Sequence, residues 1–174
     1  MAVSLDKLPL LTDDAAVRVV VEANAGSRNK LKYLPNEQAF ELHHLLPLGT
    51  SFPYDFGFLP STMGEDGDPL DAIVFADEPV PAGTVVACRL VGVVEAEQGK
   101  PGEKKERNDR FLAVSRLSHL YRDWHNLADV PGRVLDELEA FFVLYNAQRG
   151  TEFRPLARGG AARATELLMQ GRRG

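Results

Sequence analysis

Short apolar runs separated by turn-forming residues fill most of the first two thirds of the chain. Val17–Ala23, Ala72–Phe75 and Val85–Val94 are short and rich in β-branched residues, so each is expected to form a buried strand. Two further strands are expected at Leu31–Leu34 and from Ala39 to Leu46. The pattern predicts a fold built mainly from β-strands.

Helical spacing appears only near the end of the chain. Pro131 is well placed as a first helical residue, and Gly150 suits the stop of the same helix. Between them, apolar residues recur at helical spacing and form one stripe: Val134, Leu135, Leu138, Phe141, Phe142 and Tyr145. A final helix is expected at about Ala161–Gln170.

A charged run separates the strand Val85–Val94 from a later apolar stretch that begins with Phe111. This run, Glu95–Arg110, contains glycine and proline among many charged residues. Such a composition is typical of a solvated connection, so we expect an extended loop between two strands.

Length and composition are those of an ordinary globular protein. The chain has 174 residues, of which 44% are hydrophobic and 26% charged, so a single domain over residues 1–174 with its own core is expected. The formal net charge of −5 argues against general nucleic-acid binding. No apolar stretch approaches the ~20 residues of a membrane span, and no signal peptide is recognised at the N-terminus.

The number of cysteines indicates the redox environment of the protein. Cys88 is the one cysteine in the sequence, so no internal disulfide is possible, and this fits a reducing cytoplasm. Because Cys88 lies in an apolar strand, we expect an inert, buried thiol.

The chemistry of the chain concentrates in one acidic turn. Asp66, Asp68 and Asp71 stand within six residues, separated by Gly67 and Pro69, directly before an apolar strand. Glycine permits unusual backbone angles and proline fixes its own, so the turn is expected to be rigid. Carboxylates held this close need cations between them, and hard oxygen ligands suit Mg²⁺, Mn²⁺ or Ca²⁺.

Two other interpretations of this turn compete with a catalytic metal site. An acidic Asp-Gly segment is commonly a solvated turn without a ligand. An EF-hand calcium loop would use Asp66 and Asp68 as its first and third positions. It fails because the fifth position would be Leu70, and Asp71 would stand where glycine is required.

The surrounding blocks resemble a known family. The segment EDGDPLDAIV is similar to the signature of the soluble family I inorganic pyrophosphatases, and FPYDFGFLPSTM before it resembles another block of that family. Upstream, VVVEANAGSRNKLKY resembles its strand, glutamate and G-S-R-N-K run. Downstream, VVACRLVGVV and the helix Leu135–Tyr145 resemble its central strand and late helix. The likeness extends from about Val17 to Leu168, with the blocks in the family's order.

The resemblance implies a fold and an activity. The expected fold is α+β but mainly β, a small OB-like closed β-barrel flanked by two C-terminal helices. The expected activity is Mg²⁺-dependent hydrolysis of inorganic pyrophosphate to two phosphates, with Mn²⁺ or another divalent cation as an alternative cofactor. The family also implies a homo-oligomer, with neither nucleic acid nor a membrane as partner.

The resemblance also assigns roles to single residues. Asp68 is the expected catalytic base, which orients and deprotonates the attacking water. The expected metal ligands are Asp66 and Asp71, with Glu22 in the outer metal sphere. The residues expected to contact phosphate are Lys30, Arg110, Tyr145 and, in place of the family's arginine, His44.

Several positions depart from the family pattern. The family's acidic residue, two tyrosines and a lysine are replaced by Lys32, Phe52, Phe56 and Asn146, and we expect the two phenylalanines to be core residues. Two metal-binding aspartates of the family fall at about Gln98 and Asn108. Acids of the same run are candidates to restore the missing ligands: Glu103, Glu106 and Asp109.

These departures keep other functions open. One alternative is a catalytically impaired relative that serves as a metal- or phosphate-binding or oligomeric scaffold. Another is a hydrolase of a different small phosphoanhydride, because a reshaped clamp accommodates a different leaving group. A nucleic-acid-binding OB domain is the least favoured, since the net charge is acidic and no basic strip with interleaved aromatics is present.

Overall fold

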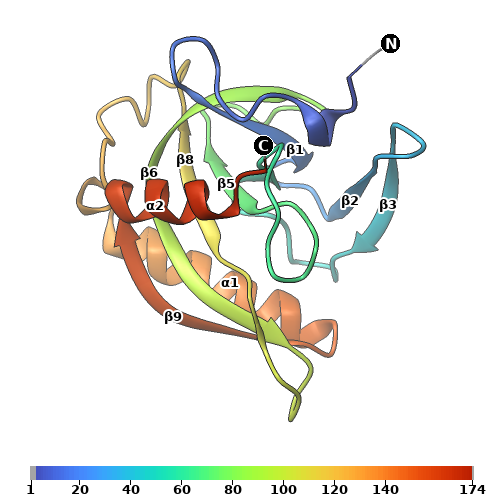
Figure 1. The fold of residues 1–174 in the computed structure, drawn as a ribbon. Helices are drawn as coiled ribbons and strands as arrows, with labels where there is room; N and C mark the ends of the chain where they lie inside the picture. The colour runs from blue at the N-terminus through green and yellow to red at the C-terminus, as the bar shows by residue number, and fades with distance from the viewer. Residues whose placement is uncertain (1–2, 174) are drawn as a thin grey trace.

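The computed structural model describes residues 3–173 and is shown in Figure 1. In chain order the strands and α-helices are β1 (Val17–Ala23), β2 (Asn29–Leu34), β3 (Ala39–Leu45), β4 (Asp55–Phe58), β5 (Asp71–Phe75), β6 (Val85–Gly99), β7 (Glu106–Arg107), β8 (Arg110–Ser115), α1 (Gly132–Gln148), β9 (Glu152–Gly160) and α2 (Ala161–Gly171). Short 3₁₀ helices cover Leu5–Lys7 and Leu127–Asp129. Within this range no helix is both long and apolar enough to cross a membrane.

The main sheet closes on itself. Its strands follow the order β1-β4-β5-β8-β6, and β1 also pairs with β6, so the path returns to its start. The β5–β8 pair is parallel whereas the other pairs are antiparallel, which makes the sheet mixed. Strands β2 and β3 form a separate hairpin beside this ring. The predicted mainly β architecture with two C-terminal helices is confirmed, with a ring-like mixed sheet as its centre.

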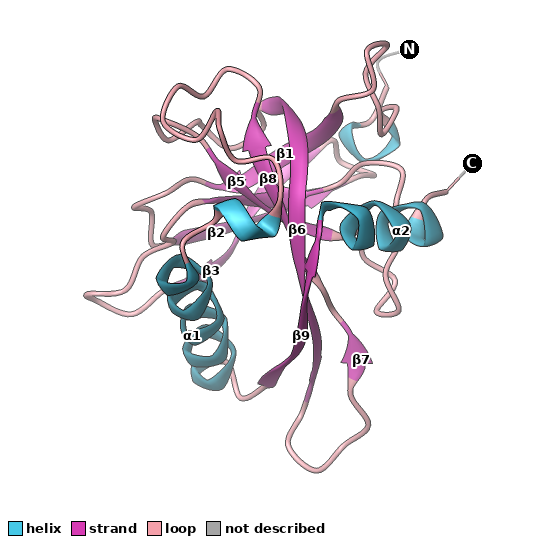
Figure 2. Ribbon diagram, turned by 90° about the vertical axis from the view of Figure 1, so that its left-hand side faces the viewer, coloured by secondary structure: helices cyan, strands magenta, loops and turns pink. Residues whose placement is uncertain are grey.

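Two hydrophobic cores lie on opposite faces of the long strand β6. Successive strand residues point to opposite faces, so Val93 and Val94 enter different cores. Val94 packs in the core that contains Phe142 of α1, and Val93 packs in the core that contains Leu168 of α2. Figure 2 shows the two helices on either side of the β6–β9 ribbon.

The acidic turn and β5 lie where the sequence predicted them. The neighbouring strand β4 packs closely against the backbone of β1. A Cβ atom on Gly57 of β4 would lie 2.0 Å from the carbonyl oxygen of Val20, so glycine is required at this point of the β1–β4 pairing. The helix predicted from the apolar stripe is also present, although Pro131 is its N-cap and Gly132 its first residue.

The structure differs most from the sequence-based expectation over Glu95–Arg110, where much of the expected loop is strand. Strand β6 continues to Gly99, and the antiparallel partner β9 runs beside it from residue 92 to residue 99. Strand β9 lacks a clear strand pattern in the sequence because it contains Pro155 and several charged residues. Ion pairs such as Arg154–Glu97 and Arg163–Glu95 explain how charged side chains are accommodated in this ladder.

Candidate active site

A cavity of about 360 Å³ opens between the β2–β3 hairpin, the acidic turn and the C-terminal half of α1. The ends of β6 and β8 complete its wall through Gln98, Asn108 and Arg110. Seven of the residues that the resemblance gave a catalytic, metal-binding or phosphate-binding role line this cavity: Glu22, Lys30, Asp66, Asp68, Asp71, Arg110 and Tyr145. The structure therefore brings together groups that are up to 123 residues apart in the sequence (22 and 145).

Local hydrogen bonds shape the acidic turn. Gly67 has a φ angle of +82°, in the region that favours glycine. The backbone N–H of Asp68 donates to Oδ1 of Asp66 at 3.0 Å, and the Gly64 N–H donates to the Asp68 carbonyl at 2.8 Å. These bonds hold the Asp66 carboxylate against its own turn, while the Asp68 side chain remains 59% exposed.

Each of three cavity carboxylates faces a cationic side chain. Lys30 Nζ lies 2.7 Å from Glu22 Oε2, and Glu22 Oε1 also accepts from the backbone N–H of Tyr33. Arg110 Nη1 lies 2.9 Å from Asp71 Oδ2. Lys32 Nζ lies 3.5 Å from Asp68 Oδ2, at the mouth of the cavity. Acidic and basic groups of the cavity are thus arranged in pairs.

Two of the aspartates sit in surroundings that disfavour their negative charge. Burial raises the pKa of Asp71 to about 6, with smaller contributions from Glu22 and Asp66, although Arg110 and Lys30 oppose this shift. Burial also raises the pKa of Asp66, with the Asp68 carboxylate adding to the effect. An additional positive charge beside Asp66 and Asp71 would stabilise both carboxylates.

The donor set fits one hydrated divalent cation. Within residues 3–173 no three histidine, cysteine, aspartate or glutamate side chains form a ready-made metal-binding group. Magnesium, however, commonly binds through one or two carboxylates together with water and substrate phosphates. Asp66 and Asp71 meet that requirement. Gln98 and Asn108, which also line the cavity, are neutral, and their side-chain oxygens accept hydrogen bonds from Arg110.

Asp109 and His44 do not line the cavity. Both carboxylate oxygens of Asp109 accept from the guanidinium of Arg107, at 2.9 and 3.0 Å, and Oδ1 also accepts from the N–H of Ala96. His44 has a buried Nε2 with no hydrogen-bond partner among the described residues, and burial lowers its pKa. Imidazole in that state is neutral near pH 7.

His43 lies on the cavity wall, where His44 was expected. The cause is an irregularity in the hairpin: Lys30 pairs with His44, whereas Leu31 pairs with Leu42, so His43 is an extra residue in β3. A bulge of this kind redirects side chains. Simple alternation along the sequence gives no signal of it.

The end of α1 supplies a further cation that was not expected from the sequence. Arg149 lines the cavity, and its Nη1 lies 3.2 Å from the hydroxyl of Tyr145, one helical turn earlier. The four-residue spacing from Tyr145 was the available signal. Asn146 is buried, and its amide donates to the carbonyl of Phe142, so it contributes no charge.

Aromatic side chains underlie the charged groups. Phe52 and Phe56 are buried, as predicted, and their ring centroids are 5.8 Å apart. Lys30 Nζ lies 4.9 Å from the centre of the Phe56 ring. The rings exclude water below the charges, which strengthens electrostatic interactions inside the cavity.

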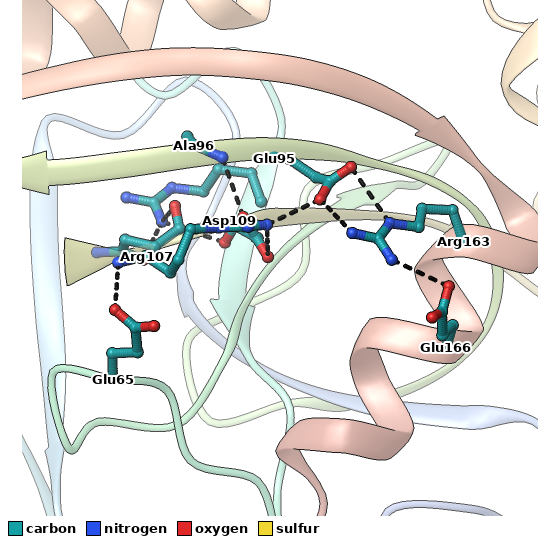
Figure 3. A network of polar contacts seen from close by, with 9 residues as sticks. Glu65, Glu95, Ala96, Arg107, Asp109, Arg163 and Glu166 are labelled. Atoms are coloured by element: carbon teal, nitrogen blue, oxygen red, sulfur yellow. Dashed lines mark hydrogen bonds and ion pairs between the residues drawn. The ribbon is translucent and has the colours of Figure 1, made fainter.

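A polar network continues from the acidic turn to α2, as Figure 3 shows. Glu65 accepts from the backbone N–H of Arg107 at 2.8 Å. The Arg107 guanidinium contacts Glu95 at 2.9 Å, and Glu95 accepts from Arg163 of α2 at 2.7 Å. The network thereby connects the turn with β7, β6 and α2.

Comparisons of the sequence with known proteins all find the same family. Residues 19–173 match the family model described as inorganic pyrophosphatase. The chain is 38% identical to the inorganic pyrophosphatase of Thermus thermophilus over 135 residues, covering 75% of this chain and 72% of the relative. It is 35% identical to that of Nostoc sp. over 141 residues, covering 81% of this chain and 80% of the relative.

Solved structures give the same result. The crystal structure of the inorganic pyrophosphatase from Thermus thermophilus superimposes with a TM-score of 0.86 and 30% identity, covering 97% of both chains. The inorganic pyrophosphatase from Helicobacter pylori superimposes with a TM-score of 0.84 and 26% identity, covering 95% of this chain and 96% of that one.

Proposed function

The chain belongs to the inorganic pyrophosphatase family, and from this membership we propose that it hydrolyses inorganic pyrophosphate to two phosphate ions in the cavity described above. The observation that carries the proposal is the convergence of Asp66, Asp68 and Asp71 with Lys30 and Arg110 on one cavity. A phosphoanhydride with several negative charges requires both kinds of group: cations that hold it, and a base that acts on water.

The basic side chains bind and orient the substrate. Lys30, Lys32 and Arg149 approach the cavity from two sides, and Tyr145 adds a hydroxyl donor. Arginine and lysine form strong, charge-assisted hydrogen bonds with phosphate oxygens. Because Lys30 and Arg110 are held by carboxylates, their positions are fixed before the substrate arrives.

Asp68 takes the proton from the attacking water. Its carboxylate is at the mouth of the cavity, and the turn hydrogen bonds keep its backbone in place. Asp66 and Asp71 would hold the divalent cation, which when bound supplies positive charge to the phosphoryl oxygens and makes water easier to deprotonate. Glu22 orients Lys30 beneath the substrate.

We also propose the identity of the cation, the state of assembly and the cellular location. Mg²⁺ is the favoured cation because the available donors are carboxylate oxygens, and Mn²⁺ accepts the same ligands. We also propose a single domain, a homo-oligomeric assembly and a cytoplasmic location, the last in keeping with a lone, buried Cys88.

Phosphate release from pyrophosphate in the presence of Mg²⁺ tests the function. The wild-type protein should release phosphate, and Asp68→Asn should lower kcat by roughly 10²–10⁴-fold, the usual contribution of a positioned base. The matched control is Asp13→Asn, the same change at an exposed turn residue that does not line the cavity, and it should retain wild-type activity.

The same assay distinguishes a second candidate function. Because three cavity carboxylates are already paired with basic side chains, a phosphate-binding protein without turnover is a coherent alternative. Phosphate binding without any phosphate release from pyrophosphate would support that alternative. Release from another small phosphoanhydride, but not from pyrophosphate, would support a change of substrate.

A further inference from the structure

Arg110 is the most enclosed cation of the cavity. Its residue is only 4% exposed, and it begins β8 directly beside Asp71, the first residue of the parallel strand β5. The guanidinium forms an ion pair with Asp71 Oδ2 at 2.9 Å, and Nη2 donates to Gln98 Oε1 at 3.2 Å. Nη1 also donates to the backbone and side-chain oxygens of Asn108.

Aromatic rings hold the same guanidinium in place. Its central carbon lies 4.8 Å from the ring centre of Phe142, 5.0 Å from that of Phe153 and 5.9 Å from that of Phe56. Each distance is within the range of a cation–π interaction. A side chain surrounded in this way is a fixed positive charge, since leaving its place would break both the aromatic and the oxygen contacts.

Apart from Asp71, the oxygen groups near Arg110 are either neutral or already paired with cationic side chains. Gln98 and Asn108 carry no charge, and the side-chain oxygens of both already accept from Arg110. The nearby carboxylates of Glu95 and Asp109 are bound by Arg107, and Glu95 also by Arg163. A divalent ion placed between Gln98 and Asn108 would contact the guanidinium of Arg110 and two neutral amides.

The carboxylates of Asp66 and Asp71 differ in this respect. Oδ1 of Asp71 makes no hydrogen bond within the described residues, and Asp66 uses Oδ1 for a bond inside its own turn. Each residue thus keeps one carboxylate oxygen available to a cation. Two such oxygens, completed by water, satisfy the way in which Mg²⁺ is usually held.

We infer that Arg110 serves as a built-in cation in place of a second divalent metal ion, so that the substrate-free cavity binds a single divalent ion at Asp66 and Asp71. This inference rests on the proposed function and makes it more specific. The rest of the pyrophosphate charge is neutralised by side chains, namely Lys30, Lys32, Arg110 and Arg149.

Counting bound Mn²⁺ tests the inference without any turnover. Isothermal titration of the substrate-free protein with Mn²⁺, checked by the electron paramagnetic resonance signal of free Mn²⁺, should give one ion per chain for the wild type. Gln98→Asp/Asn108→Asp should still bind one ion, because Arg110 pairs with the two new carboxylates. The same double change combined with Arg110→Met should bind two ions.

The single variant Arg110→Met should bind its one Mn²⁺ at least about tenfold more tightly, since a positive charge beside Asp71 has been removed. Arg110→Lys keeps that charge and should stay close to wild-type affinity. Arg122→Met, at a side chain that is 69% exposed, is the control for loss of an arginine elsewhere.

Several results would overturn the inference. They are two or more Mn²⁺ per wild-type chain, no Mn²⁺ at all, or a second ion in Gln98→Asp/Asn108→Asp while Arg110 is retained. If Arg110→Met does not fold, the wild-type and double-variant counts still decide. Phosphate release is measured separately, so a protein that binds one ion but lacks turnover would contradict the proposed function and leave this inference standing.

Discussion

At the scale of single residues, the cavity depends on which acid faces which base. Asp71 and Arg110 are register partners in the parallel pair β5–β8, so their side chains meet by strand geometry. Glu22 at the end of β1 meets Lys30 of β2 in a comparable way. In both pairs a buried charge has a partner, which is the condition under which such burial is tolerated.

Cys88 gives a residue-scale prediction outside the cavity. Burial raises the pKa of its thiol to about 12, so the thiolate fraction near pH 8 is only about 10⁻⁴. The native protein should therefore not react with a thiol-specific disulfide reagent near pH 8. One thiol per chain should react after unfolding in urea. Rapid stoichiometric labelling of the native protein would contradict the buried position of Cys88.

At the scale of elements, the strand β6 organises the molecule. It pairs with β1 at its start, with β8 in the middle and with β7 and β9 towards its end. The network shown in Figure 3 adds a side-chain link to this ladder, because Glu95 of β6 joins Arg107 of β7 to Arg163 of α2. Helix α2 is thus attached to the ring by ion pairs as well as by its apolar face.

Removing the charge of Glu95 tests this link. Glu95→Gln should lower the free energy of unfolding near pH 7 by about 1 kcal/mol, the order expected of a charge-assisted hydrogen bond. Urea unfolding of both proteins gives the value. The control is Glu137→Gln, whose side chain is 65% exposed beside Arg133 and should have little effect.

The effect of Glu95→Gln should depend on pH with a definite sign. Hydrogen bonds from Arg163 lower the pKa of Glu95 below its ordinary value of 4.5. The folded state therefore binds this proton less readily than the unfolded state, and the stabilisation is complete above pH 4.5. It is lost as pH falls through the lower, folded-state pKa. A difference between the two proteins that grew in acid would contradict this account.

At the scale of the whole molecule, the ring-like sheet leaves several large apolar side chains on the surface. Leu117 and Leu120, in the segment after β8, are 88% and 71% exposed. A contiguous apolar surface patch is typical of a contact with another chain, and Leu117 and Leu120 are candidates for such a patch. Together with the family membership, they support the proposed homo-oligomer.

The mass in solution tests that assembly. Light scattering after size-exclusion chromatography should give a multiple of the 19.1 kDa chain mass. Leu117→Glu/Leu120→Glu should shift the mass towards the monomer, because charges would be buried in an apolar contact. A wild-type mass of 19.1 kDa would contradict the assembly, and an unchanged mass in the variant would place the interface elsewhere.

The sequence by itself determined the elements whose causes are local. The apolar run Val17–Ala23, the Asp66–Asp71 turn with its glycine, and the apolar stripe of α1 are each encoded by neighbouring residues, so their patterns could be read directly. The family resemblance then predicted a small OB-like closed β-barrel, which the structure forms as a ring-like mixed sheet. It also gave a catalytic, metal-binding or phosphate-binding role to seven residues that the structure gathers around one cavity.

Only the tertiary structure decided how distant groups meet. The β6–β9 ladder, the bulge that turns His43 towards the cavity and the enclosure of Arg110 by Phe142 and Phe153 all depend on pairings between remote segments. Periodicity reports which way a side chain points within its own strand or helix. It does not report which partner lies opposite, because strand register and helix docking are set by the packing of the whole chain.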